Sequence, residues 1–267
     1  MTIKEYADGK ILGGREGKIG RLIINNPERH NATSLAMWKG AFEVVDSLAN
    51  DPETRMLVVS GNGGKAFASG ADISKFEQER SDPNDVDHYQ SSTARFYEAL
   101  YNFPKPTVAK INGYCIGGGM ALAVCCDMRI CQEKSRFGVP AAKLALGYPY
   151  EGVERLANVV GTSMAAEIFY TARQFSSTEA YEMGLVNRVV PDDELDAFVD
   201  DYAERISGNA PLTIAAIKQI KLAINAVPTE RDHEMLNSMV KACFDSKDYI
   251  EGRRAFMEKR KPDFKGS

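Results

Sequence analysis

The stretch TVAKINGYCIGGGMALAVCC, residues 107–126, carries the clearest structural signal in this chain. Its first five residues are typical of a short buried strand, and Asn112-Gly113 is typical of a turn. Three further glycines, Gly117 to Gly119, lead into an uninterrupted apolar segment that predicts a buried helix. A strand that leads through glycines into a helix indicates an α/β protein.

The same order of elements occurs elsewhere in the first two thirds of the chain. Residues 56–60 predict a continuous apolar strand, residues 61–70 a Gly-rich turn, and a helix is expected to begin near Asp72. Residues 21–25 and 128–131 predict further strands, and residues 34–49 an amphipathic helix after a Thr/Ser cap. Strands joined by helical crossovers pair in parallel, so we expect a mainly parallel α/β core.

The pattern changes after about Pro191. Helical spacing is found in four segments, which are residues 192–207, 211–226, 230–244 and 248–261. The last part of the chain is therefore predicted to be all-helical.

Composition excludes several classes of function. The chain of 267 residues has 33 Lys+Arg and 37 Asp+Glu, a net charge of −4 that does not favour a nucleic-acid partner or an anionic membrane surface. Its five cysteines are an odd number without metal-ligand spacing, which predicts buried thiols, no metal site and a reducing compartment. The first ten residues lack the apolar core of a signal peptide, and no apolar run is long enough for a membrane span. We expect a cytoplasmic protein.

The two Gly-rich segments fit neither phosphate-binding fingerprint. Residues 61–66 lack the first glycine and the Ser/Thr of a P-loop, and residues 113–119 do not have the Gly-x-Gly-x-x-Gly spacing. Both segments lead into a helix start, where unpaired backbone N–H groups point outward. One N–H from each could hold a developing oxyanion. The alternative is that these glycines only permit tight turns and close helix packing.

Several motifs in order along nearly the whole chain resemble the enoyl-CoA hydratase/isomerase (crotonase) superfamily. The matching motifs are Asn26-Pro27 with Asn31-Ala32, residues 64–73, Asn112-Gly113 with Gly117 to Gly119, Cys126-Asp127, residues 136–140, Gly184 to Asn187 with residues 189–191, and residues 256–260. The resemblance implies a crotonase-like spiral of ββα units over residues 1–204 and a C-terminal all-helical oligomerisation region over residues 205–267. It also implies a homotrimer or a dimer of trimers.

The resemblance implies an acyl-CoA thioester as substrate, with coenzyme A as part of that substrate and no separate cofactor. The thioester carbonyl would lie between the backbone N–H groups of Ala71 and Gly118. Ser69, Asp72 and Ile73 would hold the coenzyme A moiety. Phe256 and Lys259, from the same or a neighbouring subunit, would lie near its nucleotide; the alternative for Lys259 is a solvated surface charge.

The chain departs from the superfamily pattern at two positions. Hydratases of this family use two glutamates to hold and activate water, and the corresponding residues here are Ala121 and Ala141. Alanine can neither carry a proton nor orient water. Glu151 is an alternative base, and Tyr148 matches a tyrosine of methylmalonyl-CoA decarboxylases, which the chain partly resembles. Those decarboxylases have a histidine where this chain has Ala71.

Three hypotheses about function follow. The first is an enoyl-CoA hydratase-like lyase in which Glu151 or Tyr148 assists addition or elimination of water. The second is a malonyl-type CoA decarboxylase that uses Tyr148, because decarboxylation needs a stabilised enolate and no general base to start. The third is a catalytically silent acyl-CoA-binding oligomer.

Overall fold

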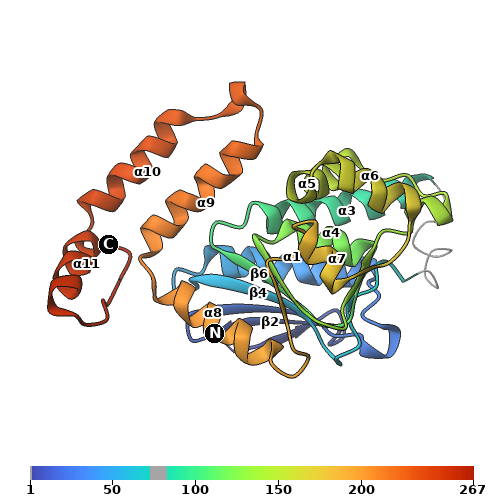
Figure 1. The fold of residues 1–267 in the computed structure, drawn as a ribbon, viewed down its shortest axis with the longest axis horizontal. Coiled ribbons are helices and arrows are strands. Elements are labelled where there is room, and N and C mark those ends of the chain that lie inside the picture. Colours follow the sequence, from blue (N-terminus) through green and yellow to red (C-terminus); the bar gives the residue numbers. More distant parts are fainter. Residues whose placement is uncertain (1, 73–82) are drawn as a thin grey trace.

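Seven strands form the main sheet of the computed structural model, which describes residues 2–72 and 83–267 (Figure 1). The first three strands pair antiparallel, and from β3 onward each neighbouring pair is parallel. In spatial order the strands are β1 (Lys4–Tyr6), β2 (Ile11–Glu16), β3 (Ile19–Ile24), β4 (Met56–Gly61), β6 (Thr107–Ile111), β8 (Met128–Gln132) and β11 (Arg188–Val190). The predicted α/β class with a mainly parallel sheet is confirmed.

A second, smaller sheet is built from the strands that directly follow β4, β6 and β8. Its parallel strands are β5 (Ala66–Ala68), β7 (Tyr114–Ile116) and β9 (Arg136–Gly138), and β10 (Phe175–Ser176) pairs antiparallel with β9. The chain thus passes three times from the main sheet, through a tight corner, into the second sheet. This repeat is the ββα spiral that the sequence resemblance implies.

Helices cover both faces of the main sheet, and the alternate residues of strand β4 show why both faces are covered. Leu57 and Val59 belong to the large core that contains α1, α3 and α4, whereas Met56 and Val58 pack on the opposite side against α8. Alternate residues of a strand point to opposite faces, so a continuous apolar strand must be covered on both. The helices of this region are α1 (Leu35–Asn50), α3 (Pro83–Tyr101), α4 (Gly118–Cys125), α5 (Tyr150–Val160), α6 (Thr162–Thr171), α7 (Ser177–Glu182) and α8 (Leu195–Gly208), with 3-10 turns η1 (Pro27–Arg29) and η3 (Ala141–Leu144).

Helix α1 begins where its cap residue predicts. The hydroxyl of Ser34 accepts a hydrogen bond from the backbone N–H of Met37, which satisfies one unpaired donor of the first turn. The helix then buries Trp38, Val44 and Leu48. The indole of Trp38 stacks on Phe96 of α3 at 5.2 Å, and this contact joins the two helices above the sheet.

The C-terminal helices α9 (Pro211–Asn225), α10 (His233–Asp245) and α11 (Lys247–Glu258), with the 3-10 turn η4 (Pro228–Glu230), project away from both sheets as an arm (Figure 1). Their bounds follow the helical segments expected from the sequence. Many of their large apolar side chains are exposed, for example Ile224, Phe244 and Phe256. A helix that exposes apolar side chains in an isolated chain has a surface available for a second chain.

One buried charge cluster attaches this arm to the core. The ammonium of Lys218 in α9, only 4% exposed, contacts both carboxylate oxygens of Asp127 at 2.7 and 2.8 Å, and Lys221 reaches the same carboxylate at 2.6 Å. Asp127 also accepts hydrogen bonds from the backbone and hydroxyl of Thr107 at the start of β6. Burial alone raises the pKa of Asp127, but the charges and hydrogen bonds of the two lysines outweigh it and lower the pKa.

We expect Asp127→Asn to lower the free energy of unfolding by about 3–5 kcal/mol, because the Lys218 ammonium stays buried without its counter-charge. Urea unfolding followed by circular dichroism measures the loss. The lowered pKa means that the carboxylate stabilises the fold fully above its unfolded value of 3.8 and loses this effect as the pH falls through the folded-state value. The difference in the free energy of unfolding between the parent and Asp127→Asn should therefore become smaller at acidic pH.

The exposed Arg205–Asp201 pair of α8 provides a control. Arg205→Gln should leave the unfolding midpoint unchanged, because solvent screens an exposed pair. If Asp127→Asn behaves like Arg205→Gln, the buried cluster does not hold the arm.

Candidate active site

The candidate site lies where two strand-to-helix corners meet. Strands β5 and β7 are parallel neighbours, so the chain leaves both at the same edge of the second sheet. There Gly70 and Gly118 approach so closely that a Cβ added to Gly70 would lie 3.2 Å from the Gly118 nitrogen. A Cβ on Gly119 would lie 2.1 Å from the carbonyl oxygen of Ala68, which no side chain can occupy. Gly70 and Gly119, which are next to the candidate donors Ala71 and Gly118, are therefore required for close packing.

The backbone N–H of Ala71 is directed toward the corner that begins α4. Residue 71 forms a parallel bridge with Thr33, in which the Thr33 N–H donates to the Gly70 carbonyl and the Asp72 N–H donates to the Thr33 carbonyl. In a parallel bridge the Gly70 carbonyl and the Asp72 N–H, on either side of Ala71, point toward Thr33. The N–H of Ala71 itself therefore points away from Thr33. The other side of this segment is occupied by β7 and the start of α4.

The N–H of Gly118 is also available. Gly118 is the first residue of α4, and the first intrahelical bond of this turn runs from the Ala121 N–H to the Gly117 carbonyl. Neither the Ala71 N–H nor the Gly118 N–H donates a hydrogen bond to any residue that the structure describes. Two unpaired donors beside one glycine contact can bind a single anionic oxygen.

The two alanine positions lie next to these donors. Ala121 is one turn into α4, and Ala141 begins η3 directly after Pro140, whose Cδ is 3.9 Å from a Cβ built on Gly117. Both alanines are 9% exposed. Both positions thus carry only a methyl group, and neither can transfer a proton.

A phenol that the sequence analysis did not select lies at the same corner. The hydroxyl of Tyr97, in α3, donates to the Gly118 carbonyl at 3.0 Å and lies 3.3 Å from a Cβ built on Gly118. Burial, followed by the nearby Tyr148, raises the pKa of Tyr97 well above its ordinary value. No motif marks Tyr97, because its helical spacing is equally typical of a core aromatic residue.

Tyr148 is half-buried in the segment between η3 and α5. The rings of Tyr148 and Phe169 in α6 pack edge to face, with their centroids 4.8 Å apart. Gly152 leaves room for the tyrosine, because a Cβ on Gly152 would lie 2.6 Å from the Tyr148 ring. Burial raises the pKa of Tyr148, with smaller contributions from Cys125 and Cys115. A phenol with a raised pKa is protonated at neutral pH, so Tyr148 can donate a hydrogen bond or a proton but is not a general base.

Glu151 lies in the first turn of α5 and is exposed. It forms no hydrogen bond or ion pair with another residue in the described part of the chain. A glutamate in this position is stabilised by the helix dipole whether or not it takes part in chemistry.

The residues expected to bind coenzyme A fall into two groups. Ser69 and Asp72 flank the Gly70 corner, and the Asp72 carboxylate is 3.6 Å from the guanidinium of Arg29. Ile73 lies outside the described residues. Phe256 and Lys259 are at the end of α11, which Figure 1 shows on the arm, away from α4. A single chain therefore does not bring the two groups together.

Comparison with known proteins identifies the family that has this spiral of ββα units and these two glycine corners. A family model described as "Enoyl-CoA hydratase/isomerase" matches residues 14–267. The chain therefore belongs to the enoyl-CoA hydratase/isomerase family. None of the described helices is both long and apolar enough to cross a membrane.

Individual relatives are similar over almost their full length. The chain is 34% identical over 257 residues to a crotonyl-CoA hydratase of Syntrophomonas wolfei, covering 95% of this chain and 97% of the relative. It is 34% identical to a carnitinyl-CoA dehydratase of Salmonella typhi, covering 94% of this chain and 97% of the relative. A crystal structure of an "enoyl-CoA hydratase/ carnithine racemase" from Magnetospirillum magneticum aligns with a TM-score of 0.90 at 35% identity, over 97% of this chain and 96% of that one.

We expect Gly119→Ala to lower the free energy of unfolding by about 1–3 kcal/mol or more, because the methyl group must displace the backbone of β5. Differential scanning calorimetry measures the change. Gly147→Ala is the matched control, because a Cβ at Gly147 has nothing within 4 Å. Equal melting temperatures for the two variants would show that the corner tolerates a side chain.

Proposed function

We propose that this chain catalyses a reaction of acyl-CoA thioesters in which the N–H groups of Ala71 and Gly118 stabilise a thioester enolate. The observation that carries the proposal is the pair of unpaired N–H groups beside the Gly70–Gly118 contact. Membership in a family whose similar proteins include a crotonyl-CoA hydratase and a carnitinyl-CoA dehydratase supports the substrate class.

The energetic argument depends on where charge develops. When electrons move onto the α-carbon, the thioester oxygen becomes an anion, and fixed donors stabilise it more than they stabilise the neutral carbonyl. Each such donor contributes roughly 3–4 kcal/mol to the transition state. Helix α4 adds the positive end of its dipole at the same point.

The absence of carboxylates at Ala121 and Ala141 determines which reactions this site can start. Hydration of an enoyl-CoA adds the oxygen of water to the β-carbon and a proton to the α-carbon, so it needs a group that accepts a proton from water. Exposed Glu151 is the candidate for that role, while protonated Tyr148 is suited only to the donor role.

Decarboxylation of a malonyl-type CoA ester is the second candidate, and the protonated phenol of the half-buried Tyr148 favours it. The bond between the α-carbon and the carboxylate breaks, CO₂ leaves, and the electron pair forms the enolate. The enolate then takes up one proton at the α-carbon. No base is needed at the start, and a protonated Tyr148 is suited to supply the final proton or to hold the leaving carboxylate.

Binding of coenzyme A is proposed to involve two chains. Ser69, Asp72 and Ile73 would contact the nucleotide from one subunit, and Phe256 and Lys259 from a neighbour. The 83% exposure of Phe256 and the apolar surface of the arm support contact with a second chain. The proposed assembly is a trimer, or a dimer of trimers, in which residues 205–267 form the contacts around a core of residues 1–204.

The first test removes one donor without adding a large side chain. Proline lacks an N–H and is tolerated at the first residue of a helix, so Gly118→Pro should fold yet lower kcat about 100- to 1,000-fold. Crotonyl-CoA, followed by loss of enoyl absorbance, and methylmalonyl-CoA, followed by CO₂ release, are the two substrates. Gly147→Ala is the control and should keep parental activity.

The outcomes separate the three hypotheses. Turnover of crotonyl-CoA alone contradicts the decarboxylase, and CO₂ release from methylmalonyl-CoA alone contradicts the hydratase. If the parent turns over neither ester while Gly118→Pro still binds them, the chain is a silent acyl-CoA-binding protein.

A second prediction assigns the proton donor. If the phenol donates a proton, Tyr148→Phe should lower kcat for the accepted substrate about 100-fold while KM changes little. Glu151→Gln should have that effect only in a hydratase, where water must lose a proton. Tyr170→Phe, at an 83% exposed position, is the matched control. Full activity in both Tyr148→Phe and Glu151→Gln would exclude these side chains as the proton-transfer groups.

A further inference from the structure

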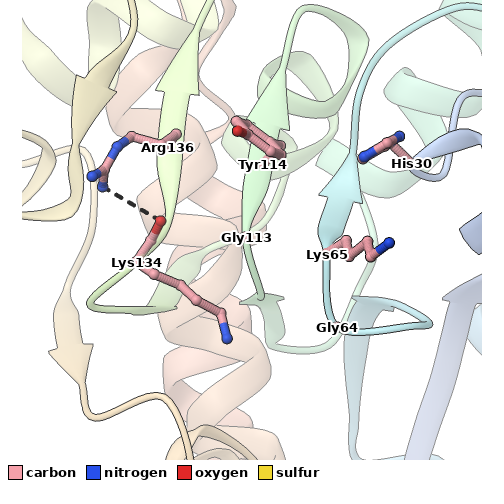
Figure 2. Close-up of a pocket in the computed structure, with 7 residues that line it drawn as sticks. All are labelled: His30, Gly64, Lys65, Gly113, Tyr114, Lys134 and Arg136. Atoms are coloured by element: carbon pink, nitrogen blue, oxygen red, sulfur yellow. Dashed lines mark hydrogen bonds between the residues drawn. The ribbon is translucent and has the colours of Figure 1, made fainter.

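A basic pocket lies at the end of the second sheet opposite to the glycine corners. It is lined by His30, Gly64, Lys65, Gly113, Tyr114, Lys134 and Arg136 and encloses about 390 Å³ (Figure 2). This volume falls within the range of small-molecule sites, roughly 300–1,000 Å³. The candidate oxyanion donors follow the carboxyl ends of β5 and β7, whereas this pocket lies at their amino ends.

The spiral brings the lining residues together through strand register. Ala66 of β5 pairs with Tyr114 of β7, and Tyr114 pairs with Arg136 of β9. Three successive corners of the chain, far apart in sequence, therefore place their side chains in one row. Figure 2 shows Tyr114 in the middle, with His30 and Lys65 on one side and Lys134 and Arg136 on the other.

Backbone contacts make the floor of this pocket rigid. The Tyr114 N–H donates to the Lys65 carbonyl, and the Arg136 N–H donates to the Gly113 carbonyl, both at 3.1 Å. A Cβ on Gly113 would lie 2.0 Å from the Lys65 carbonyl oxygen, so the corners pack directly on each other. The backbone that carries the charged side chains is thus held by contacts between the corners, which lowers the cost of ordering it around a ligand.

The charge of the lining is unbalanced in a chain whose net charge is −4. Lys65, Lys134 and Arg136 are cationic, and none of the described lining residues carries a carboxylate. Lys134 has a partner outside the pocket, since its ammonium is 3.2 Å from the Asp192 carboxylate. Within residues 2–72 and 83–267, the hydrogen bonds of the Arg136 guanidinium go to backbone carbonyls of its own turn, those of Lys134 and Ser135, so its charge is not neutralised by these contacts.

We propose that this pocket binds a phosphate-bearing anion, at a site separate from the Ala71 and Gly118 N–H groups that are proposed to hold the thioester. Lys65, Lys134 and Arg136 line one pocket, and none of its described lining residues carries a carboxylate, which favours a multiply charged phosphate that accepts several charge-assisted hydrogen bonds at once. The rings of Tyr114 and His30, edge to face with centroids 6.3 Å apart, provide an aromatic wall beside the cations. The same phosphate chemistry can be presented by inorganic pyrophosphate or by a nucleoside diphosphate.

Isothermal titration calorimetry with pyrophosphate and with ADP tests this proposal, using the full chain saturated with coenzyme A so that the thioester site is occupied. Both probes should bind, more weakly as the salt concentration rises. Lys65→Gln and Arg136→Gln should each weaken binding about tenfold. Lys241→Gln, at an exposed position on α10, is the matched control and should bind like the parent.

The two probes distinguish the source of the phosphate. If ADP binds more tightly than pyrophosphate and Tyr114→Ala removes only that gain, the ligand is a nucleotide. Equal binding of the two, insensitive to Tyr114→Ala, indicates a free polyphosphate.

Three results would overturn the proposal. They are no saturable binding of either probe to the parent, equal binding to the parent and to both Lys65→Gln and Arg136→Gln, and loss of binding when coenzyme A is present. None of these results bears on the oxyanion donors, so the proposal can fail while the proposed function stands.

Discussion

The contact between Gly70 and Gly118 is the constraint on which the site depends. Two backbone corners approach so closely that a Cβ on Gly70 would lie 3.2 Å from the nitrogen of Gly118, and a Cβ on Gly119 would lie 2.1 Å from a backbone oxygen. Because no side chain separates them, the start of α4 and the segment that leads to Ala71 lie next to each other. The unpaired donors thus result from strand pairing and glycine packing, and they do not depend on any functional side chain.

The side chains around these donors limit the chemistry to which the donors contribute. With alanine at positions 121 and 141, the described side chains near the start of α4 include the phenols of Tyr97 and Tyr148, and burial raises the pKa of both. Protonated phenols donate hydrogen bonds and do not accept protons at neutral pH. These phenols therefore fit the proposed role of the site, which is to stabilise an enolate, better than they fit the role of a base that removes a proton.

The arm and the core are joined in a different physical way. Asp127 lies just before β8, and its carboxylate holds Lys218 and Lys221 of α9 as well as Thr107 of β6. Beyond this anchor the helices of the arm keep apolar side chains exposed. The buried ion pair fixes the direction of α9 relative to the core, where few apolar side chains pack between the two. The apolar surface of the arm therefore remains free for another chain.

The α/β class, the helical C-terminal third, the family and the glycine corners could be predicted from the sequence, because they depend on local periodicity and on motifs that can be read in order. The sequence did not identify β1, which has three residues, or β2, in which Gly13 and Gly14 interrupt the strand pattern. Tyr97 and the basic pocket were decided by tertiary structure alone. Tyr97 reaches Gly118 across 21 residues, and Lys65, Tyr114 and Arg136 become neighbours only through the register of β5, β7 and β9. Residues that meet through strand pairing leave no pattern in the order of the chain, since their spacing is set by the lengths of the connections between them.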